Sequence, residues 1–307
     1  MNQYEKDILN LLKDKFIKKF GECEFRLGSE GLGYWLKDYE KNLIYPMNDA
    51  AKAAYDDGAG GEIQSGKIGA LKSSSALTYN LFHNEKANII LPKHKISKGI
   101  YSVEFEKKFS TIKGSSMSAH LDAFLYCDAI NEAIACEMKM TEWLFNAPSA
   151  LSASYLKPEK YIDNGLTFAS VARALVGDCE EGCAKYKPIF TSYDGCQMFK
   201  HAISLYRACY ENKIPRKTKR LTLLNCVWTL PHSDFLSNEA SKRKYAESWE
   251  KEIEEFKHFK ALMQPIKELF ALTLKIDFDI ELCTFKETVE MLEKPKNELI
   301  YYERYFI

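Results

Sequence analysis

Apolar residues recur along the chain with two different periods, and these periods predict a mixed α/β fold. Residues 4–20, 196–212 and 241–263 carry apolar side chains at the three- and four-residue spacing of amphipathic helices. Residues 100–112 instead alternate apolar and polar side chains, which is typical of a half-buried strand. By the same criteria we expect further strands at 118–127, 131–143 and 220–230, and further helices at 73–82 and 166–176.

The order of these elements predicts how the chain is organised. The short link from Asp128 to Asn131 permits a hairpin between two of the strands. A core of helix, three strands, helix and strand follows, with the Gly-rich stretch near residue 58 as its boundary. We therefore divide the chain into an N-terminal helical extension (1–57), a core (58–235) and a C-terminal helical extension packed on the core (236–307).

One strand contains an acid and a base two positions apart. The run is AIACEMKM, residues 133–140. Since alternate residues of a strand share a face, Glu137 and Lys139 point one way while Ile134, Cys136 and Met138 point the other. The apolar set anchors the strand in the core, and the charged pair emerges together on the opposite face.

The preceding strand supplies a second acid. If the two strands pair through the short link, Asp122 approaches the face that carries Glu137 and Lys139. Two carboxylates and the backbone carbonyl of Met138 suit a hard divalent cation such as Mg²⁺. With Lys139 beside it, such a site is suited to phosphodiester hydrolysis. The plainer interpretation is a solvent-facing ion pair, because an Asp followed by Glu-x-Lys also occurs by chance.

The same residues carry a resemblance to a known family. Asp122 followed by Glu137-Met138-Lys139 on adjacent strands resembles the PD-(D/E)XK nuclease superfamily, with Leu121 in place of the nominal proline. The stretch GAGGEIQSGKIGALKSSSALTYNLF (58–82), together with EMKMTEW (137–143), resembles a restriction-endonuclease-like subgroup. That subgroup has a Gly-Glu segment, an SSxALxxNxF helix and an E-x-K-x-T-E motif after an Asp. The resemblance covers roughly residues 58–230, with a weaker similarity at 303–305.

The resemblance implies a fold, a reaction and a set of site residues. The expected fold is a restriction-endonuclease-like core, in which a three-stranded antiparallel meander continues into a mixed sheet flanked by helices. Asp122 and Glu137 would bind Mg²⁺, or Mn²⁺ in its place, with Glu62 helping to hold the metal or its waters. Lys139 would position the attacking water. Gln197 resembles the downstream glutamine of the superfamily and would reach Lys139 or a substrate phosphate, with His201 one turn later on the same face.

Two groups of basic residues are candidates for contact with nucleic acid, although solvated loops are the plainer interpretation of each group. The first group consists of Lys213, Arg216, Lys217, Lys219 and Arg220. The second group consists of Lys93, Lys95, Lys98, Lys107 and Lys108.

Composition narrows the class of protein without fixing its function. The 307 residues are 46% hydrophobic, and the 43 basic residues balance the 43 acidic ones, so the chain lacks the global positive charge of many nucleic-acid binders. Nine scattered cysteines favour a reducing compartment. The charged N-terminus does not resemble a signal peptide, and no apolar run has the length of a membrane span. We therefore expect a cytoplasmic protein without a membrane partner.

Other chemistry is less well supported by the sequence. Cys179, Cys183, Cys196 and His201 do not have a common zinc-ligand spacing, and buried free thiols explain these cysteines better. The Gly-rich run lacks the spacing of a dinucleotide-binding loop, and no nucleophile motif is present.

The sequence thus predicts a Mg²⁺-dependent DNA endonuclease of the restriction type, with RNA left open as a substrate and a homodimer expected for double-strand cleavage. A nucleic-acid-binding or interaction module that keeps the fold without catalysis is the alternative, and a hydrolase of another phosphate ester is a third.

Overall fold

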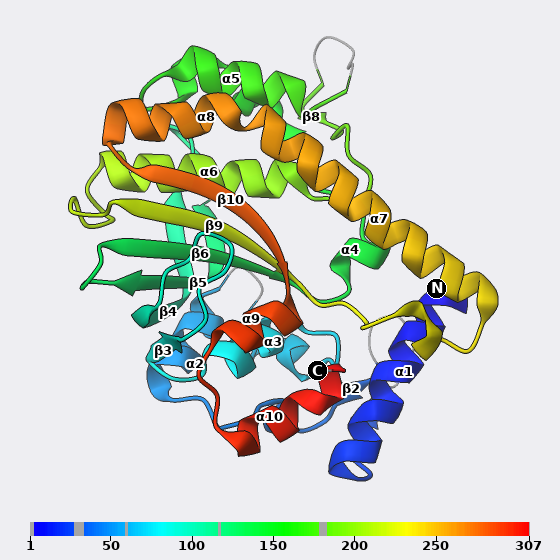
Figure 1. Cartoon of the computed structure of the whole chain (residues 1–307). Coiled ribbons are helices and arrows are strands. Elements are labelled where there is room, and N and C mark those ends of the chain that lie inside the picture. Colours follow the sequence, from blue (N-terminus) through cyan, green and yellow to red (C-terminus); the bar gives the residue numbers. More distant parts are fainter. Residues whose placement is uncertain (1–2, 28–33, 59–60, 116–117, 178–182, 307) are drawn as a thin grey trace.

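A six-stranded mixed sheet with helices on both faces forms the centre of the molecule (Figure 1). The computed structural model describes residues 3–27, 34–58, 61–115, 118–177 and 183–306. The sheet strands, in chain order, are β3 (Lys86–Ile89), β4 (Gly99–Ser110), β5 (Ser118–Cys127), β6 (Glu132–Lys139), β9 (Arg220–Val227) and β10 (Asp277–Thr284). Their spatial order is β10-β9-β6-β5-β4-β3; β3 to β6 form an antiparallel meander, and β9 and β10 run parallel to β6.

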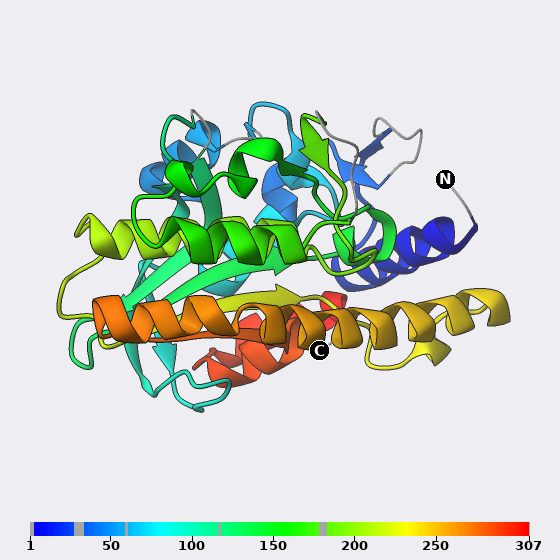
Figure 2. The same ribbon diagram turned by 90° about the horizontal axis from the view of Figure 1, so that it is seen from above.

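Helices from distant parts of the sequence cover the two faces (Figures 1 and 2). One face carries α5 (Gly165–Ala174), α6 (Gly195–Tyr210), α7 (Glu239–Leu262) and α8 (Gln264–Leu269). The other side carries α2 (Asp49–Asp57), α3 (Ser74–Phe82), α9 (Phe285–Met291) and α10 (Lys296–Tyr302), with α1 (Gln3–Phe20) beside them. Short elements join these: α4 (Glu142–Phe145) and the two-residue strand pairs β1 (Phe25–Arg26) with β2 (Trp35–Leu36), and β7 (Leu151–Ser152) with β8 (Lys185–Tyr186).

Strand alternation in β6 divides its side chains between two hydrophobic cores. Ile134, Cys136 and Met138 belong to the core that also contains side chains of α1, α3 and α9. Ala133 and Ala135 belong to the core beneath α5 and α6. The predicted opposition of these two sets is therefore confirmed, and the face of β6 that carries Glu137 is the one covered by α6.

The sheet contains two strands that the pattern did not predict. β10 lies within residues 236–307, so the prediction of a wholly helical C-terminal extension is wrong there. Its sequence alternates Phe278, Ile280 and Leu282 with acids, a strand pattern that the longer helical signal before it obscured. β3 is only four residues long and forms one edge of the sheet. The expected mixed α/β sheet flanked by helices, and the hairpin at 128–131, are confirmed.

The two central strands of the meander separate at one end, and this separation positions the candidate site. β5 and β6 pair from Cys127 and Glu132 at the hairpin as far as Ala123 and Cys136. Beyond that pair β5 continues alongside β4, while β6 continues alongside β9. We call the opening between them the fork. Asp122 and Glu137 are the first residue of each strand inside it.

None of the helices in the described ranges combines the length and the apolar character required to cross a bilayer.

Candidate active site at the fork

The fork brings the two predicted metal ligands together. Continuing the β5–β6 register by one position would set Asp122 opposite Glu137. Instead of a ladder bond between backbones, the Met138 amide donates to Oδ2 of Asp122 over 2.6 Å. The amide and carbonyl of one strand residue point to the same side, so the Met138 carbonyl also faces the fork.

Glu137 is the centre of a hydrogen-bonded network that reaches α6. Its Oε1 accepts from the Lys139 ammonium and from the Gln197 amide, each over 2.7 Å. Its Oε2 lies 3.0 Å from Nε2 of His201. The Lys139 ammonium also donates to Oε1 of Gln197 over 2.7 Å. The Glu137 side chain is 5% exposed and that of Lys139 18% exposed, so this network is nearly closed to solvent.

These contacts hold both members of the pair in their charged forms. Burial alone would raise the pKa of Glu137, but the charges of Lys139 and His201 outweigh it and lower that pKa to about 2. Burial alone would lower the pKa of Lys139, but the negative charges around it, Glu137 first, raise that pKa above its ordinary value. The plainer interpretation of this pair, a solvent-facing ion pair, is therefore wrong.

Helix α6 is held in place at its first turn by a residue that also belongs to the site. Asp194 is the N-cap of α6 and accepts from the backbone amide of Gln197 over 3.0 Å. The hydroxyl of Ser149 donates to its other carboxylate oxygen over 2.6 Å. An N-cap satisfies amide donors that lack an intrahelical partner, so the start of α6 and the Gln197 side chain are fixed together.

A further acid, Glu106, was not predicted. It lies in β4 directly opposite Asp122, between the pairs Phe105–Ala123 and Lys107–Leu121, and it has a positive φ of 47°. The simple alternation in this segment had placed Glu106 with the solvent-facing side chains. The irregular backbone turns it toward the site, which no short-range pattern signals.

Burial, and after it the charges of neighbouring acids, raise the pKa of three acids in this region. Burial, followed by the charges of Glu137 and Glu62, raises the pKa of Glu106 to about 7. Burial, with the charges of Glu137 and Glu106, raises the pKa of Asp122 well above its ordinary range. Glu62, in the turn before α3, has a raised pKa, mainly through burial. The strand register therefore places Asp122, Glu137 and the unpredicted Glu106 at the fork, while Glu62 acts on Glu106 through its charge.

The donor set at the fork fits a hard divalent cation in its chemistry. Four carboxylates and a backbone carbonyl are oxygen ligands of the kind that Mg²⁺ prefers. Burial raises the pKa of three of these acids, Asp122, Glu106 and Glu62, whereas the pKa of Glu137 is lowered. Within the described ranges, however, no three His, Cys, Asp or Glu side chains converge closely enough to hold one ion. Glu137 keeps its oxygens on Lys139, Gln197 and His201, and would have to exchange one of these partners to bind a metal.

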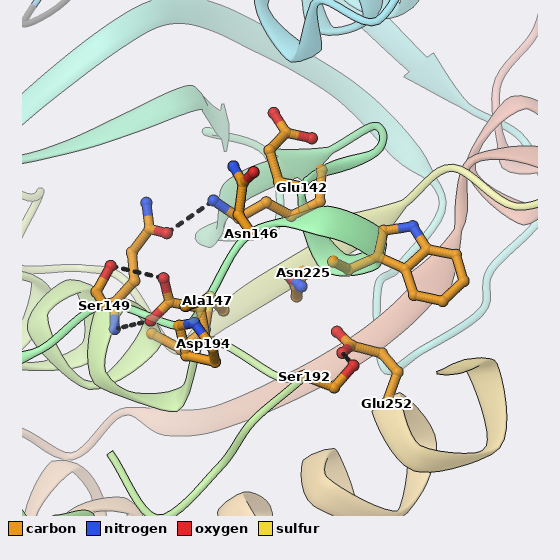
Figure 3. A pocket seen from close by; sticks show the side chains of 13 residues that line it. Glu142, Asn146, Ala147, Ser149, Ser192, Asp194, Asn225 and Glu252 are labelled. Atoms are coloured by element: carbon orange, nitrogen blue, oxygen red, sulfur yellow. Dashed lines mark hydrogen bonds between the residues drawn. The ribbon is translucent and has the colours of Figure 1, made fainter. Parts of the chain in front are cut away.

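A pocket of about 210 Å³ opens beside Lys139 (Figure 3). Helix α4, β9, α7 and the start of α6 surround it, and several of its polar residues were not predicted from the sequence. Those lining the pocket are Glu142, Asn146, Ser149, Ser192, Asp194, Asn225 and Glu252. Glu142 is the last residue of the E-x-K-x-T-E motif, and this motif was the one sequence signal for a pocket residue. Glu252 is far from the motif in the sequence, and no sequence pattern indicated its position in the pocket.

The first basic group lies at the opposite end of the sheet from the fork. Arg220 begins β9 and pairs with Glu132 at the hairpin end of β6. The length of β9 separates it from the Lys139 end by about 23 Å at 3.3 Å per residue. Lys217 pairs with Asp128, and Lys213 with Glu211. The structure does not bring this group, which also includes Arg216 and Lys219, to the site.

In the second basic group, Lys107 and Lys108 lie on β4 near the fork. Lys108 pairs with His120 across β4 and β5, and its ammonium contacts the carboxylate of Asp57. Lys95 contacts Asp279, Lys93 pairs with Glu290, and Lys107 pairs with Glu104. These cations therefore have acidic partners within the chain.

Two other sequence features have structural roles. Of the residues considered for zinc, Cys179 lies outside the described residues, Cys183 and Cys196 are free thiols, and His201 contacts Glu137. Asn80, from the SSxALxxNxF helix, donates to the Tyr305 hydroxyl over 3.0 Å. The helix at 73–82 and the C-terminal segment 303–305, which both contributed to the resemblance, are therefore hydrogen-bonded to each other.

Comparison with known proteins gives no match: no protein-family model, no curated protein and no solved structure resembles the chain significantly.

Proposed function

We propose that this protein is a metal-dependent nuclease that hydrolyses DNA phosphodiester bonds, as a restriction-type endonuclease acting as a homodimer. The observation that carries the proposal is the shared network at the fork, in which Glu137 binds Lys139 and Gln197 beside the Asp122 carboxylate. Ion pairs on strand surfaces do not need a half-buried glutamine bridging acid and base. A site that must hold an ammonium in one orientation does.

The acids at the fork would hold Mg²⁺, or Mn²⁺, through Asp122, Glu137, Glu62 and the Met138 carbonyl, with Glu106 as the additional carboxylate. When bound there, the cation would polarise a phosphoryl oxygen and lower the pKa of its water. Because the raised pKa of Lys139 keeps it protonated near neutral pH, its part is to donate a hydrogen bond and to offset negative charge. It does not act as a general base in that state.

A plasmid-cleavage assay with Mg²⁺ tests this function. Lys139→Met and Asp122→Asn should each lower the cleavage rate by about 100-fold or more, because each removes an interaction with the developing charge or its metal. The control variants are Lys267→Met and Asp279→Asn. They alter a similarly buried pair on α8 and β10, whose atoms lie 2.9 Å apart, and they should cleave at the wild-type rate. Equal cleavage by the site variants and wild type would refute the proposal.

One observation favours the alternative of a nucleic-acid-binding module without catalysis. The oxygens of Glu137 are all engaged by side chains of the chain itself, so its site is closed by internal bonds. This alternative predicts that DNA binds equally well with Mg²⁺ and with EDTA, and that Lys139→Met leaves the affinity unchanged. The nuclease predicts affinity that rises with Ca²⁺, which occupies magnesium sites and usually does not support cleavage.

A further inference from the structure

The pocket beside Lys139 has a buried acceptor that no group in the described part of the chain satisfies. Asn225 lies on β9, paired in register with Glu137, and is 3% exposed. Among the described residues its Oδ1 has no hydrogen-bond partner, and its side chain lines the pocket (Figure 3). An unsatisfied buried acceptor costs free energy, on the order of 1–3 kcal/mol, unless a ligand or water supplies a donor.

Two further side chains that line the pocket, Glu252 and Glu142, also carry acceptor oxygens. Glu252 projects from α7, is 2% exposed and accepts from the Ser192 hydroxyl over 2.9 Å. Burial raises the pKa of Glu252 to about 7, and the charges of Glu255 and Asp194 add to the effect. Glu142 accepts from the Met140 amide over 2.6 Å through one oxygen. On this side the pocket offers acceptors to a ligand that carries N–H donors, while Lys139, Gln197 and Asn146, which also line it, carry donors of their own.

A metal ion is a poorer match than an extended ligand. The described carboxylates do not converge in threes, so a single cation would not collect enough of them. Trp143 forms an apolar wall whose position is fixed, because its indole N–H donates to the Trp228 carbonyl over 3.0 Å and its ring packs edge-on against Tyr245. A rigid aromatic side chain in the same pocket as these acceptors suits a flat ring with amino groups.

We propose that this pocket binds one amino-bearing nucleobase (adenine, cytosine or guanine) of a nucleic-acid strand, turned out of its stack next to the scissile phosphate. At about 210 Å³ the pocket is smaller than a site for a drug-sized ligand and suits a single ring system. The exocyclic amino group donates to Oδ1 of Asn225, and Glu252 accepts a second N–H. Enzymes that act on nucleic acids read an extruded base by such hydrogen bonds and by aromatic contact.

This inference deepens the proposed function and rests on it for the position of the phosphate, but its test does not need cleavage. Binding of deoxyadenosine, deoxycytidine and thymidine is measured without metal by saturation-transfer NMR titration. Thymidine is the comparison because its base lacks an amino group. Wild type should bind the two amino-bearing nucleosides about ten-fold more tightly, the equivalent of one hydrogen bond. Equal affinity for all three, or no binding, would overturn the proposal.

Two pocket variants separate recognition from folding. Asn225→Leu should abolish the preference, and Glu252→Gln, which keeps the side-chain volume, should reduce it several-fold. If Asn225→Leu does not fold, Glu252→Gln decides the question. The control is Asn297→Leu on the exposed surface of α10, which should keep the preference. A preference that survives unchanged in both folded pocket variants contradicts the assignment.

Single-stranded octamers of dA, dC and dT in Ca²⁺ identify the source of the base. A strand as the natural ligand predicts that the dA and dC octamers bind more tightly than the matching nucleosides, and equal affinity would contradict it. If the protein binds these bases but does not cleave plasmid, the base-binding proposal stands and the nuclease proposal fails. If it cleaves plasmid but does not bind these bases, the nuclease proposal stands and the base-binding proposal fails.

Discussion

The acidic side chains at the fork repel one another, and the positive charge of Lys139 offsets this repulsion most strongly at Glu137. Asp122, Glu106 and Glu62 all have raised pKa values, while Glu137 alone is held ionised, with its pKa at about 2. The difference arises because Lys139 and His201 contact Glu137 and not the other three acids. Ionisation of these three acids is unfavourable in the folded state, and a bound cation would favour their ionised forms.

The raised pKa of Glu106 predicts a measurable pH dependence of the free energy of unfolding. Its raised pKa means that the folded state binds more protons than the unfolded state between about pH 4.5 and 7. Its contribution to the free energy of unfolding is therefore fully present below about pH 4.5 and is lost as the pH rises through 7. Wild type should therefore lose free energy of unfolding between pH 5 and pH 8. Glu106→Gln should reduce this loss by up to roughly 3 kcal/mol, as measured by urea unfolding at the two pH values.

Glu104→Gln is the matched control, since Glu104 lies two residues earlier on the same strand and pairs with Lys107 at the surface. It should leave the pH dependence as in wild type. Saturating Mg²⁺ should also restore wild-type stability at pH 8 more than at pH 5, because a cation favours the ionised acids. If the free energy of unfolding has the same pH dependence in Glu106→Gln and in wild type, the pKa of the Glu106 carboxyl is not raised.

Among the elements, α6 connects the sheet chemistry to the pocket. Its N-cap Asp194 lines the pocket and fixes the turn that carries Gln197, which in turn bonds both Glu137 and Lys139. A loss of the cap therefore changes both helix stability and the orientation of the ammonium.

Asp194→Ala should lower the free energy of unfolding by about 1 kcal/mol and cleavage by at least ten-fold. Asn238→Ala removes a cap of the same kind at the start of α7, where the side chain accepts from the amides of Ala240 and Ser241. That control should lose similar stability, measured by urea unfolding, but no activity. Equal cleavage by the two variants would show that the cap does not position the site.

Element prediction from the sequence worked where one period dominated. AIACEMKM alternated clearly, so the two faces of β6 and the joint position of Glu137 and Lys139 could be predicted. Asp122 followed from the short link, because a hairpin of that length fixes the partner strand. Glu106 could not be predicted, because its direction depends on one positive φ in β4 and on its position opposite Asp122 in the β4–β5 register. Glu252 needed the tertiary position of α7.

At the scale of the whole molecule, the two ends of the chain close around the same core. Arg304 is buried near the C-terminus, donates to Oδ1 of Asn42 over 2.5 Å, and stacks its guanidinium over the ring of Phe16 in α1. The Trp228 indole, one residue beyond β9, donates to the Tyr305 carbonyl over 3.1 Å. The C-terminal residues thus connect α1, the segment before α2 and the end of the sheet that carries the site.

Arg304→Ala should therefore destabilise the protein by about 3 kcal/mol in urea unfolding, because it leaves buried acceptors without a donor. Arg243→Ala is the control: this arginine lies on the exposed face of α7, 3.9 Å from Glu247, and its loss should cost less than about 0.5 kcal/mol. Similar values for both variants would show that the terminal contacts are not needed for stability.

The proposed nuclease requires a metal bound at the fork. The direct measurement is the anomalous difference density of crystals soaked in Mn²⁺, compared between wild type and Asp122→Asn. The predicted result is one strong peak in wild type within about 2.6 Å of an Asp122 carboxylate oxygen, near Glu137 or the Met138 carbonyl, and its loss in the variant. Density elsewhere alone, or a peak at the fork that persists without the Asp122 carboxylate, would contradict the account.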